Sequence, residues 1–168
     1  MLHRESLEKL IARYGIAGLS EADIDHLNRV WHRLDPWPDA VEGLTRLKRR
    51  FIIAPCSNGN IALIVQMAKR AGLPWDCVLG AETARAYKPM PEAHLAACRQ
   101  LGLEPASVMM VAAHNGDLKA AKAQGLATAF VPRPTEYGPG QRSDLAPEPN
   151  CADLVAESFV TLAQKLGC

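Results

Sequence analysis

The run Val108-Met109-Met110-Val111-Ala112-Ala113-His114-Asn115-Gly116-Asp117 carries the strongest structural signal in this chain of 168 residues. Its six consecutive apolar residues are typical of a buried strand, and the polar residues after them indicate a loop that leads into a helix. Ligands of parallel α/β sheets bind beyond the carboxyl ends of the strands. Residues 114–117 are therefore expected to contribute to a functional site.

Strand and helix signals alternate on both sides of this run. Four segments are expected to be strands: 51–54, 77–79, 108–112 and 127–131. Four segments have helical spacing or helix signals: 60–71, 92–101, 118–124 and most of 154–166. The Pro- and Gly-rich segment 133–150 is expected to be an exposed loop. This alternation predicts an α/β fold, a Rossmann-like parallel sheet with helices on both faces.

Residues 1–50 show helical spacing and no strand signal. Ser20 followed by Asp23, and Asp39 followed by Glu42, are typical of helix N-termini. We expect two or three helices here. The predicted organisation is thus a helical cap segment of residues 1–50 and an α/β core of residues 51–168.

Composition and charge exclude several classes of protein. The chain is 48% hydrophobic, which is enough for one core. Its 19 Lys and Arg and 18 Asp and Glu give a net charge of +1, so there is no electrostatic reason to expect binding to nucleic acid or to an anionic membrane. The apolar runs are far shorter than a membrane span, and the charged start Met1-Leu2-His3-Arg4-Glu5 is unlike a secretory signal. We expect a cytoplasmic protein with no nucleic-acid or membrane partner.

Metal ligands and disulfides are not indicated by the spacing of histidines and cysteines. The five cysteines form no Cys-x-x-Cys pair and read as buried thiols of a reducing compartment. Four histidines stand at spacings that suit no metal site: His3, His26, His32 and His94. No metal is expected at any of them.

Ser57-Asn58-Gly59 follows the first expected strand and leads into a helix. A hydroxyl, an amide and free backbone N–H groups at a helix N-terminus suit an anionic ligand. The structural alternative is that Ser57 or Asn58 caps the helix and Gly59 eases the turn.

Lys88 follows the second expected strand and stands between Tyr87 and Pro89, so its backbone is restrained. A positioned ammonium stabilises a carboxylate, a phosphate or a developing negative charge. The alternative is a surface lysine in front of a helix that begins near Pro91.

His114, Asn115 and Asp117 follow the third strand. Asp117 can cap the next helix, accept from an ammonium, hold a metal or activate a water. His114 can be a metal ligand, a donor to substrate or a partly buried polar residue, and we group Asn115 with it as a substrate-binding candidate. Polar clusters at three successive strand ends favour a common site over three separate structural roles.

These residues in this order resemble a known family. Ser57-Asn58-Gly59, then Tyr87-Lys88-Pro89-x-Pro91, then Val111-Ala112-Ala113-His114-Asn115-Gly116-Asp117 resemble motifs two, three and four of the haloacid dehalogenase superfamily, especially its type II 2-haloacid dehalogenases. The helices before residue 45 resemble the cap of that branch. The resemblance covers essentially the whole chain.

The resemblance implies a fold, an activity and residue roles. It implies a hydrolase acting on carbon–halide bonds, in which an aspartate attacks the halogen-bearing carbon and water hydrolyses the resulting ester, with no cofactor. Lys88, Asp117 and Ser57 would be the catalytic residues. Substrate, a small anionic 2-haloacid, would be bound by Ser57, Asn58, His114 and Asn115. Ser57 and Asn58 would hold its carboxylate, and Asp117 would support Lys88 and the hydrolytic water.

The family's first motif, an aspartate after a central strand, has no counterpart in the sequence. No apolar run is followed by Asp-x-x-x-Thr or Asp-x-Asp. We therefore expect an N-terminally truncated chain that lacks the nucleophile and the central strand between 51–55 and 108–112. An empty place there would expose two strand edges. The chain is then expected to be poorly stable alone, or to complete its sheet with an N-terminal segment or as a homodimer.

Two other functions stay open. A phosphatase of the same superfamily would need Mg²⁺ held by several carboxylates, and the fourth cluster offers only Asp117. A non-catalytic α/β fragment would bind small anions or a protein through the face that carries Ser57, Lys88 and Asp117.

Overall fold

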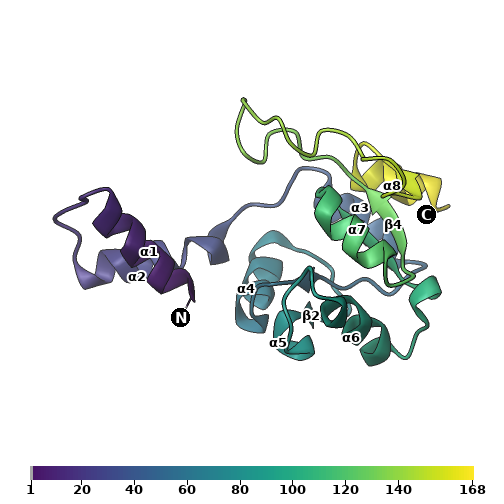
Figure 1. Cartoon of the computed structure of the whole chain (residues 1–168), viewed down its shortest axis with the longest axis horizontal. Coiled ribbons are helices and arrows are strands. Elements are labelled where there is room, and N and C mark those ends of the chain that lie inside the picture. Colours follow the sequence, from purple (N-terminus) through teal and green to yellow (C-terminus); the bar gives the residue numbers. More distant parts are fainter. Residues whose placement is uncertain (1) are drawn as a thin grey trace.

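The computed structural model describes residues 2–168 (Figure 1). Its helices are α1 (Leu2–Arg13), α2 (Glu21–Asn28), η1 (Val30–Arg33), α3 (Ala40–Lys48), α4 (Ile61–Ala71), α5 (Ala81–Ala84), α6 (Pro91–Leu101), η2 (Pro105–Ser107), α7 (Asn115–Lys122) and α8 (Phe159–Lys165). Its strands are β1 (Cys56–Ser57), β2 (Leu79–Gly80), β3 (Met109–Ala112), β4 (Ala127–Phe130) and β5 (Leu154–Val155). Among these residues no helix has the length and apolar character needed to cross a bilayer.

All the strands are parallel, and they form two separate sheets. β1 pairs with β2, with Cys56 opposite Leu79. The second sheet has the order β3-β4-β5, with Met109 opposite Ala127 and Ala129 opposite Leu154. Parallel strands connected by helices confirm the predicted α/β class. β1 and β3 are not paired with each other in residues 2–168. The central strand expected between them stays a prediction.

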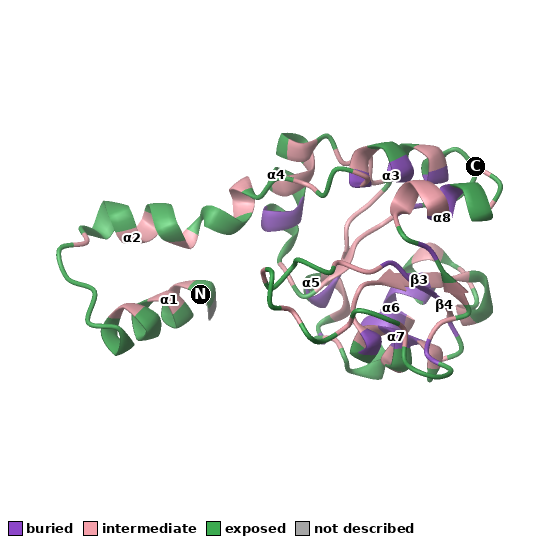
Figure 2. Cartoon of the chain, turned by 90° about the horizontal axis from the view of Figure 1, so that it is seen from above, coloured by how far each residue is buried: buried purple, intermediate pink, exposed green. Residues whose placement is uncertain are grey.

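The core lies between the second sheet and its helices (Figure 2). On one side, α3 and α8 pack against each other, and Leu44 and Leu162 meet Ala129 and Val131 in one apolar cluster. On the other, Leu118 of α7 is fully buried with Met110 and Phe130. Helices therefore cover both faces of this sheet, as the apolar strand sequences predict.

The N-terminal helices α1 and α2 stand apart from the sheets (Figure 1), and their described residues are exposed or half-buried. The predicted cap at Ser20 is confirmed, because its hydroxyl accepts from Asp23 N while the Asp23 carboxylate accepts from Ser20 N. η1 packs on α4, where Arg70 pairs with Asp35. The next helix, α3, belongs to the packed body through its contacts with α8.

Several predicted boundaries were wrong. The segment 51–54 forms no ladder, because Ile53 N donates to the Asp76 carboxylate and Ile53 O accepts from Asp76 N, and pairing begins only at Cys56. The expected strand 77–79 is Leu79–Gly80. The predicted helix 154–166 begins with strand β5, and α8 starts later, behind an N-cap at Ser158. Two strand residues are too few to show a period.

α3 begins directly after Asp39, as predicted. Asp39 makes no side-chain cap bond. Its carboxylate binds the Arg133 guanidinium through two N–O contacts of 3.0 and 3.1 Å and accepts from Phe159 N at 2.7 Å. Burial opposes ionisation, but the Phe159 N–H and Arg133 outweigh it and hold the pKa of Asp39 below its usual value. Asp39 therefore ties α3 to α8 and to the segment after β4.

Candidate active site

The three predicted clusters converge at the carboxyl ends of the strands. Ser57 ends β1, and the segment after α5 brings Lys88 into contact with Asn58, the next residue. The α7 N-terminus, directly after β3, supplies Asp117. Right-handed crossovers between parallel strands bring these loops to one edge.

Lys88 and Asp117 form an ion pair at the centre of this group. Lys88 Nζ lies 2.8 Å from Asp117 Oδ2, and their side chains are 16% and 21% exposed. Asp117 lies inside the first turn of α7, where the helix dipole favours a carboxylate. Its carboxylate is thus engaged by a cation rather than by the cap bond that was the structural alternative.

Asn58 holds the main chain of Lys88. Its Oδ1 accepts from Lys88 N at 2.8 Å, and its Nδ2 donates to Lys88 O at 3.2 Å. Both ends of the amide are therefore used inside the protein, which gives Asn58 a positioning role.

The hydroxyl of Ser57 accepts from Gly59 N at 2.9 Å, so its own proton remains available to a ligand. The backbone of β2 at Gly80 packs closely against the backbone of Ser57. Gly80 has a φ of 133°, and a Cβ there would lie 2.1 Å from Ser57 O. Only glycine allows β2 to approach Ser57 this closely.

His114 is oriented by residues of the long loop after β4. Its Nε2 lies 2.9 Å from Glu136 Oε2 and 3.3 Å from the Tyr137 hydroxyl, and the Tyr137 ring stacks on it at 6.2 Å. The imidazole also lines the cavity that contains Lys88 and Asp117.

Asn115 is buried and hydrogen-bonded to the loop after β4. It is 5% exposed. Its Nδ2 donates to Asp144 and to Ala146 O, and its Oδ1 accepts from Glu148 N at 2.8 Å. The side chain attaches the 133–150 loop to α7, and the expected contact of Asn115 with substrate stays a prediction.

A cavity of about 700 Å³ separates β1 from β3 and reaches the Lys88–Asp117 pair. Its walls are mainly apolar, and six of the residues along its two sides are Ile52, Ala54, Cys56, Met109, Val111 and Ala113. Pro55 O accepts from Leu79 N, and Ala112 O accepts from Val131 N. Because neighbouring strand residues alternate in direction, the backbone groups of Ala54 and Val111 face the cavity instead.

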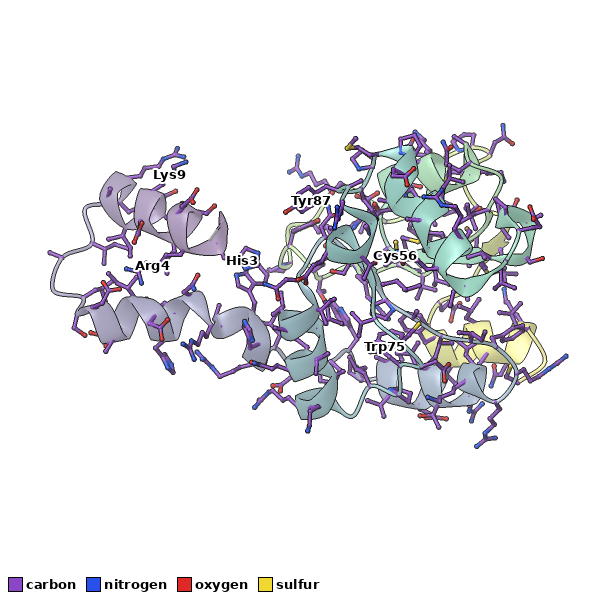
Figure 3. The ribbon with its side chains drawn as sticks, turned by 90° about the horizontal axis from the view of Figure 1, so that it is seen from below. His3, Arg4, Lys9, Cys56, Trp75 and Tyr87 are labelled. Carbon is purple, nitrogen blue, oxygen red and sulfur yellow. The ribbon has the colours of Figure 1, made fainter. Side chains whose placement is uncertain are left out.

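Cys56 lies in the interior of the body, whereas Tyr87 lies at its edge on the side of the N-terminal helices (Figure 3). Burial raises the pKa of the Cys56 thiol, and the nearby Lys88 cation only partly offsets this. A protonated thiol is a poor nucleophile. Cys56 is half-buried rather than buried as predicted, and its thiol is not an activated nucleophile.

A bound Mg²⁺ does not fit the side chains present. Within residues 2–168 no three His, Cys, Asp or Glu side chains are grouped as a metal site. Asp117 is the carboxylate at the strand ends, and it is paired with Lys88.

His94, whose spacing in the sequence argued only against a metal site, also lines the cavity. His94 on α6 is 1% exposed, and neither ring nitrogen has a hydrogen-bond partner in the described structure.

Known proteins resemble the chain over most of its length. The family model of haloacid dehalogenase-like hydrolases matches residues 2–125. An (S)-2-haloacid dehalogenase 4A from Burkholderia cepacia is 31% identical over 148 residues, which are 84% of this chain and 62% of that protein. The chain thus spans less than two thirds of that curated relative.

Two solved structures have the same fold. The L-2-haloacid dehalogenase PA0810 is 51% identical with a TM-score of 0.95, over 98% of this chain and 72% of that one. The defluorinating L-2-haloacid dehalogenase Rha0230 is 49% identical with a TM-score of 0.95, over 99% and 69%. The order of the polar clusters, the parallel α/β fold and the family match agree, and the chain belongs to the haloacid dehalogenase-like hydrolases.

Proposed function

We propose that this chain provides most of the active site of a hydrolase that removes halide from short 2-haloalkanoic acids. The observation that carries the proposal is the partly buried Lys88–Asp117 pair at the carboxyl end of an apolar cavity. An apolar wall suits the alkyl and halogen parts of such an acid, and the ammonium suits the charges of the reaction. Relatives named as 2-haloacid dehalogenases support the same substrate class, a small organic anion.

Each polar residue has a role in this proposal. Ser57 donates its hydroxyl proton to the substrate carboxylate, and Lys88 pairs with the attacking carboxylate. Asp117 holds the ammonium and orients the hydrolytic water. Asn58 keeps the Lys88 main chain in place, and His114 lies at the cavity wall, where it contacts the substrate.

The chemistry balances without a cofactor. A carboxylate oxygen attacks the carbon that bears the halogen, a carbon–oxygen bond forms, and the halide leaves with the bonding electrons. Water then attacks the acyl carbon of the ester, which releases a 2-hydroxy acid and regenerates the carboxylate. One proton per turnover passes to solvent.

The attacking carboxylate is proposed to come from a further strand seated between β1 and β3. This is supported by the backbone groups of Ala54 and Val111, which face the cavity, because an unpaired strand edge readily accepts another strand. A parallel strand running toward the carboxyl ends would deliver its last residues beside Lys88. A second copy of the chain is the other possible donor. The five free thiols fit a reducing compartment, and we assign the chain to the cytoplasm.

Product analysis tests the substrate class. The chain, with and without an added Asp-ended strand segment, is incubated with 2-chloropropionate or with a phosphate monoester plus Mg²⁺. Chloride release that is lost in Lys88→Met and kept in the control Lys9→Met supports the dehalogenase. Phosphate release instead would assign a phosphatase, and silence with every substrate would favour a binding fragment.

A further inference from the structure

Arg133 joins three segments of the protein at one point. Its guanidinium forms a two-pronged ion pair with the Asp39 carboxylate, and both side chains are largely buried, at 12% and 16% exposed. Its Cζ also lies 5.1 Å from the centroid of the Trp37 ring and 5.3 Å from that of the Phe159 ring. A paired guanidinium that lies over two aromatic rings is held in one orientation. Arg133 therefore fixes the start of the loop after β4 to α8 and to the residues before α3.

The turn that follows Arg133 carries the side chains of Glu136 and Tyr137. Glu136 N donates to Arg133 O at 3.1 Å, and Gly138 N donates to Thr135 O at 3.0 Å. Because these hydrogen bonds close the turn on itself, the position of Arg133 determines where the Glu136 and Tyr137 side chains lie.

Glu136 determines which nitrogen of His114 carries the proton. Its Oε2 lies 2.9 Å from His114 Nε2, and a carboxylate at this distance requires a donor on that nitrogen. In the neutral ring Nδ1 is then an acceptor. It has no hydrogen-bond partner within residues 2–168 and, unlike the ring nitrogens of His94, it is not buried. His114 lines the cavity that contains Lys88 and Asp117, so Nδ1 is the ring atom available there to a hydrogen-bond donor such as water.

The contact between Glu136 and His114 needs support from outside the pair. The two side chains are 33% and 37% exposed, and a pair with that much exposure is weak by itself. The loop that carries Glu136 is rich in Pro and Gly, and the hydrogen bonds of Asn115 hold only its far part, from Asp144 onward. Of these two anchors, Arg133 is the one that holds the turn of Glu136.

We propose that Arg133 and Glu136 are positioning residues of the active site, Glu136 by holding the proton of His114 on Nε2 and Arg133 by holding Glu136. Trp37 and Asp39 belong to the linker between η1 and α3, so the same arginine connects the N-terminal helices to the His114 ring. The proposal rests on the proposed function for the reaction that His114 serves. The arrangement of the side chains does not depend on turnover.

The arrangement is tested by NMR of the full chain with ¹⁵N-labelled histidine, in alkaline buffer where imidazole rings are neutral. The parent should carry the His114 proton on Nε2 and show a nuclear Overhauser contact between the stacked His114 and Tyr137 rings. Arg133→Met should shift the His114 signals and lose that contact. Arg133→Lys, which keeps the charge but not the planar fork, should show an intermediate shift. Arg142→Met is the matched control, because Arg142 lies exposed on the same loop, and it should leave the His114 signals in place.

The functional part is tested by chloride release from 2-chloropropionate, with the chain completed by an Asp-ended strand segment. Glu136→Leu and Arg133→Met should each lower kcat about tenfold, with a smaller change in KM, because the ring loses its fixed tautomer and orientation. Glu136→Gln, which keeps an acceptor for Nε2, should stay within about threefold of the parent, as should Arg142→Met.

Each outcome decides the proposal. A parent ring protonated on Nδ1 would overturn it. His114 signals that do not move in folded Arg133→Met, even though its melting temperature falls, would also overturn it, because a purely structural role predicts that result. If Arg133→Met does not fold, Glu136→Leu in the partly exposed turn serves for the same NMR test. The expected NMR result without halide release in any form would retain the arrangement and remove the proposed function. Chloride release unchanged in Glu136→Leu would retain that function and remove the positioning role.

Discussion

Asn58 holds both main-chain groups of Lys88, accepting from its N–H at 2.8 Å and donating to its carbonyl at 3.2 Å, across 30 residues of sequence. The turn after β1 and the segment before α6 are therefore one unit. The position of the ammonium over Asp117 depends on this amide as well as on the ion pair itself.

Replacing Asn58 should loosen that unit. Asn58→Ala removes two hydrogen bonds of about 1 kcal/mol each, so the free energy of unfolding should fall by about 1–2 kcal/mol. Asn58→Asp keeps the acceptor for Lys88 N, so its free energy of unfolding should fall by less than that of Asn58→Ala. Urea unfolding measures both, with Gln124→Ala as an amide-to-alanine control outside the site. A loss in Asn58→Ala no larger than in the control would contradict the positioning role.

Two glycines should respond in opposite ways to the same added methyl group. Gly80→Ala places a Cβ 2.1 Å from Ser57 O at a φ of 133°, whereas a Cβ at Gly116 meets no atom within 4 Å. Gly80→Ala should cost at least about 2 kcal/mol, and Gly116→Ala in α7 should stabilise by up to about 1 kcal/mol. Thermal unfolding of the two variants checks this. Equal melting temperatures would contradict the described contact between β2 and Ser57.

The Lys88–Asp117 pair should show strong energetic coupling. Lys88→Met leaves Asp117 as a partly buried charge without a partner and should cost about 2–3 kcal/mol, near the lower end for buried pairs because both side chains keep some exposure. The double variant Lys88→Met/Asp117→Leu should cost less than the sum of the two single changes. A double-mutant cycle in urea provides the measurement, and simple additivity would mean that the two charges do not interact.

Stability should fall on mild acidification because of His94. Its pKa is lowered in the folded protein, so below about pH 6.5 the unfolded chain binds a proton that the folded chain does not. Between pH 7.5 and 5.5 this costs at most about 1.4 kcal/mol. Urea unfolding at the two pH values should show a smaller fall in His94→Phe. The charged groups that act on the ring are Lys88 and Asp117, and an identical fall in parent and variant would assign the pH dependence elsewhere.

Apolar runs and strand-end positions in the sequence were enough to predict individual strands and one residue of the site. Apolar runs indicated β3 and β4, and the polar residues after β3 indicated Asp117, because ligands bind where parallel strands end. Long-range partners could not be predicted. Asp39 looked like a helix cap, yet its partners Arg133 and Phe159 lie 94 and 120 residues away.

The residues of the site could likewise be predicted from local sequence, whereas their contacts with distant segments could not. Lys88 and Asp117 could be singled out from their restrained or strand-end positions. The hydrogen bonds of Asn115 to the loop after β4 could not be inferred, because that loop has no periodic pattern from which a contact could be predicted. For His94 the sequence argued only against a metal site, because helical spacing indicates that a residue is buried and does not indicate what it faces.

The proposed mechanism requires that Lys88 and Asp117 serve a carboxylate carried on a strand between β1 and β3. It is tested most directly by chloride release from 2-chloropropionate, with the chain alone, with an added apolar strand ending in Asp, and with the same strand ending in Asn. We predict chloride and 2-hydroxypropionate in equal amounts with the Asp strand only, and loss of both in Lys88→Met. Equal chloride release by the chain alone, or with the Asn strand, would contradict the account.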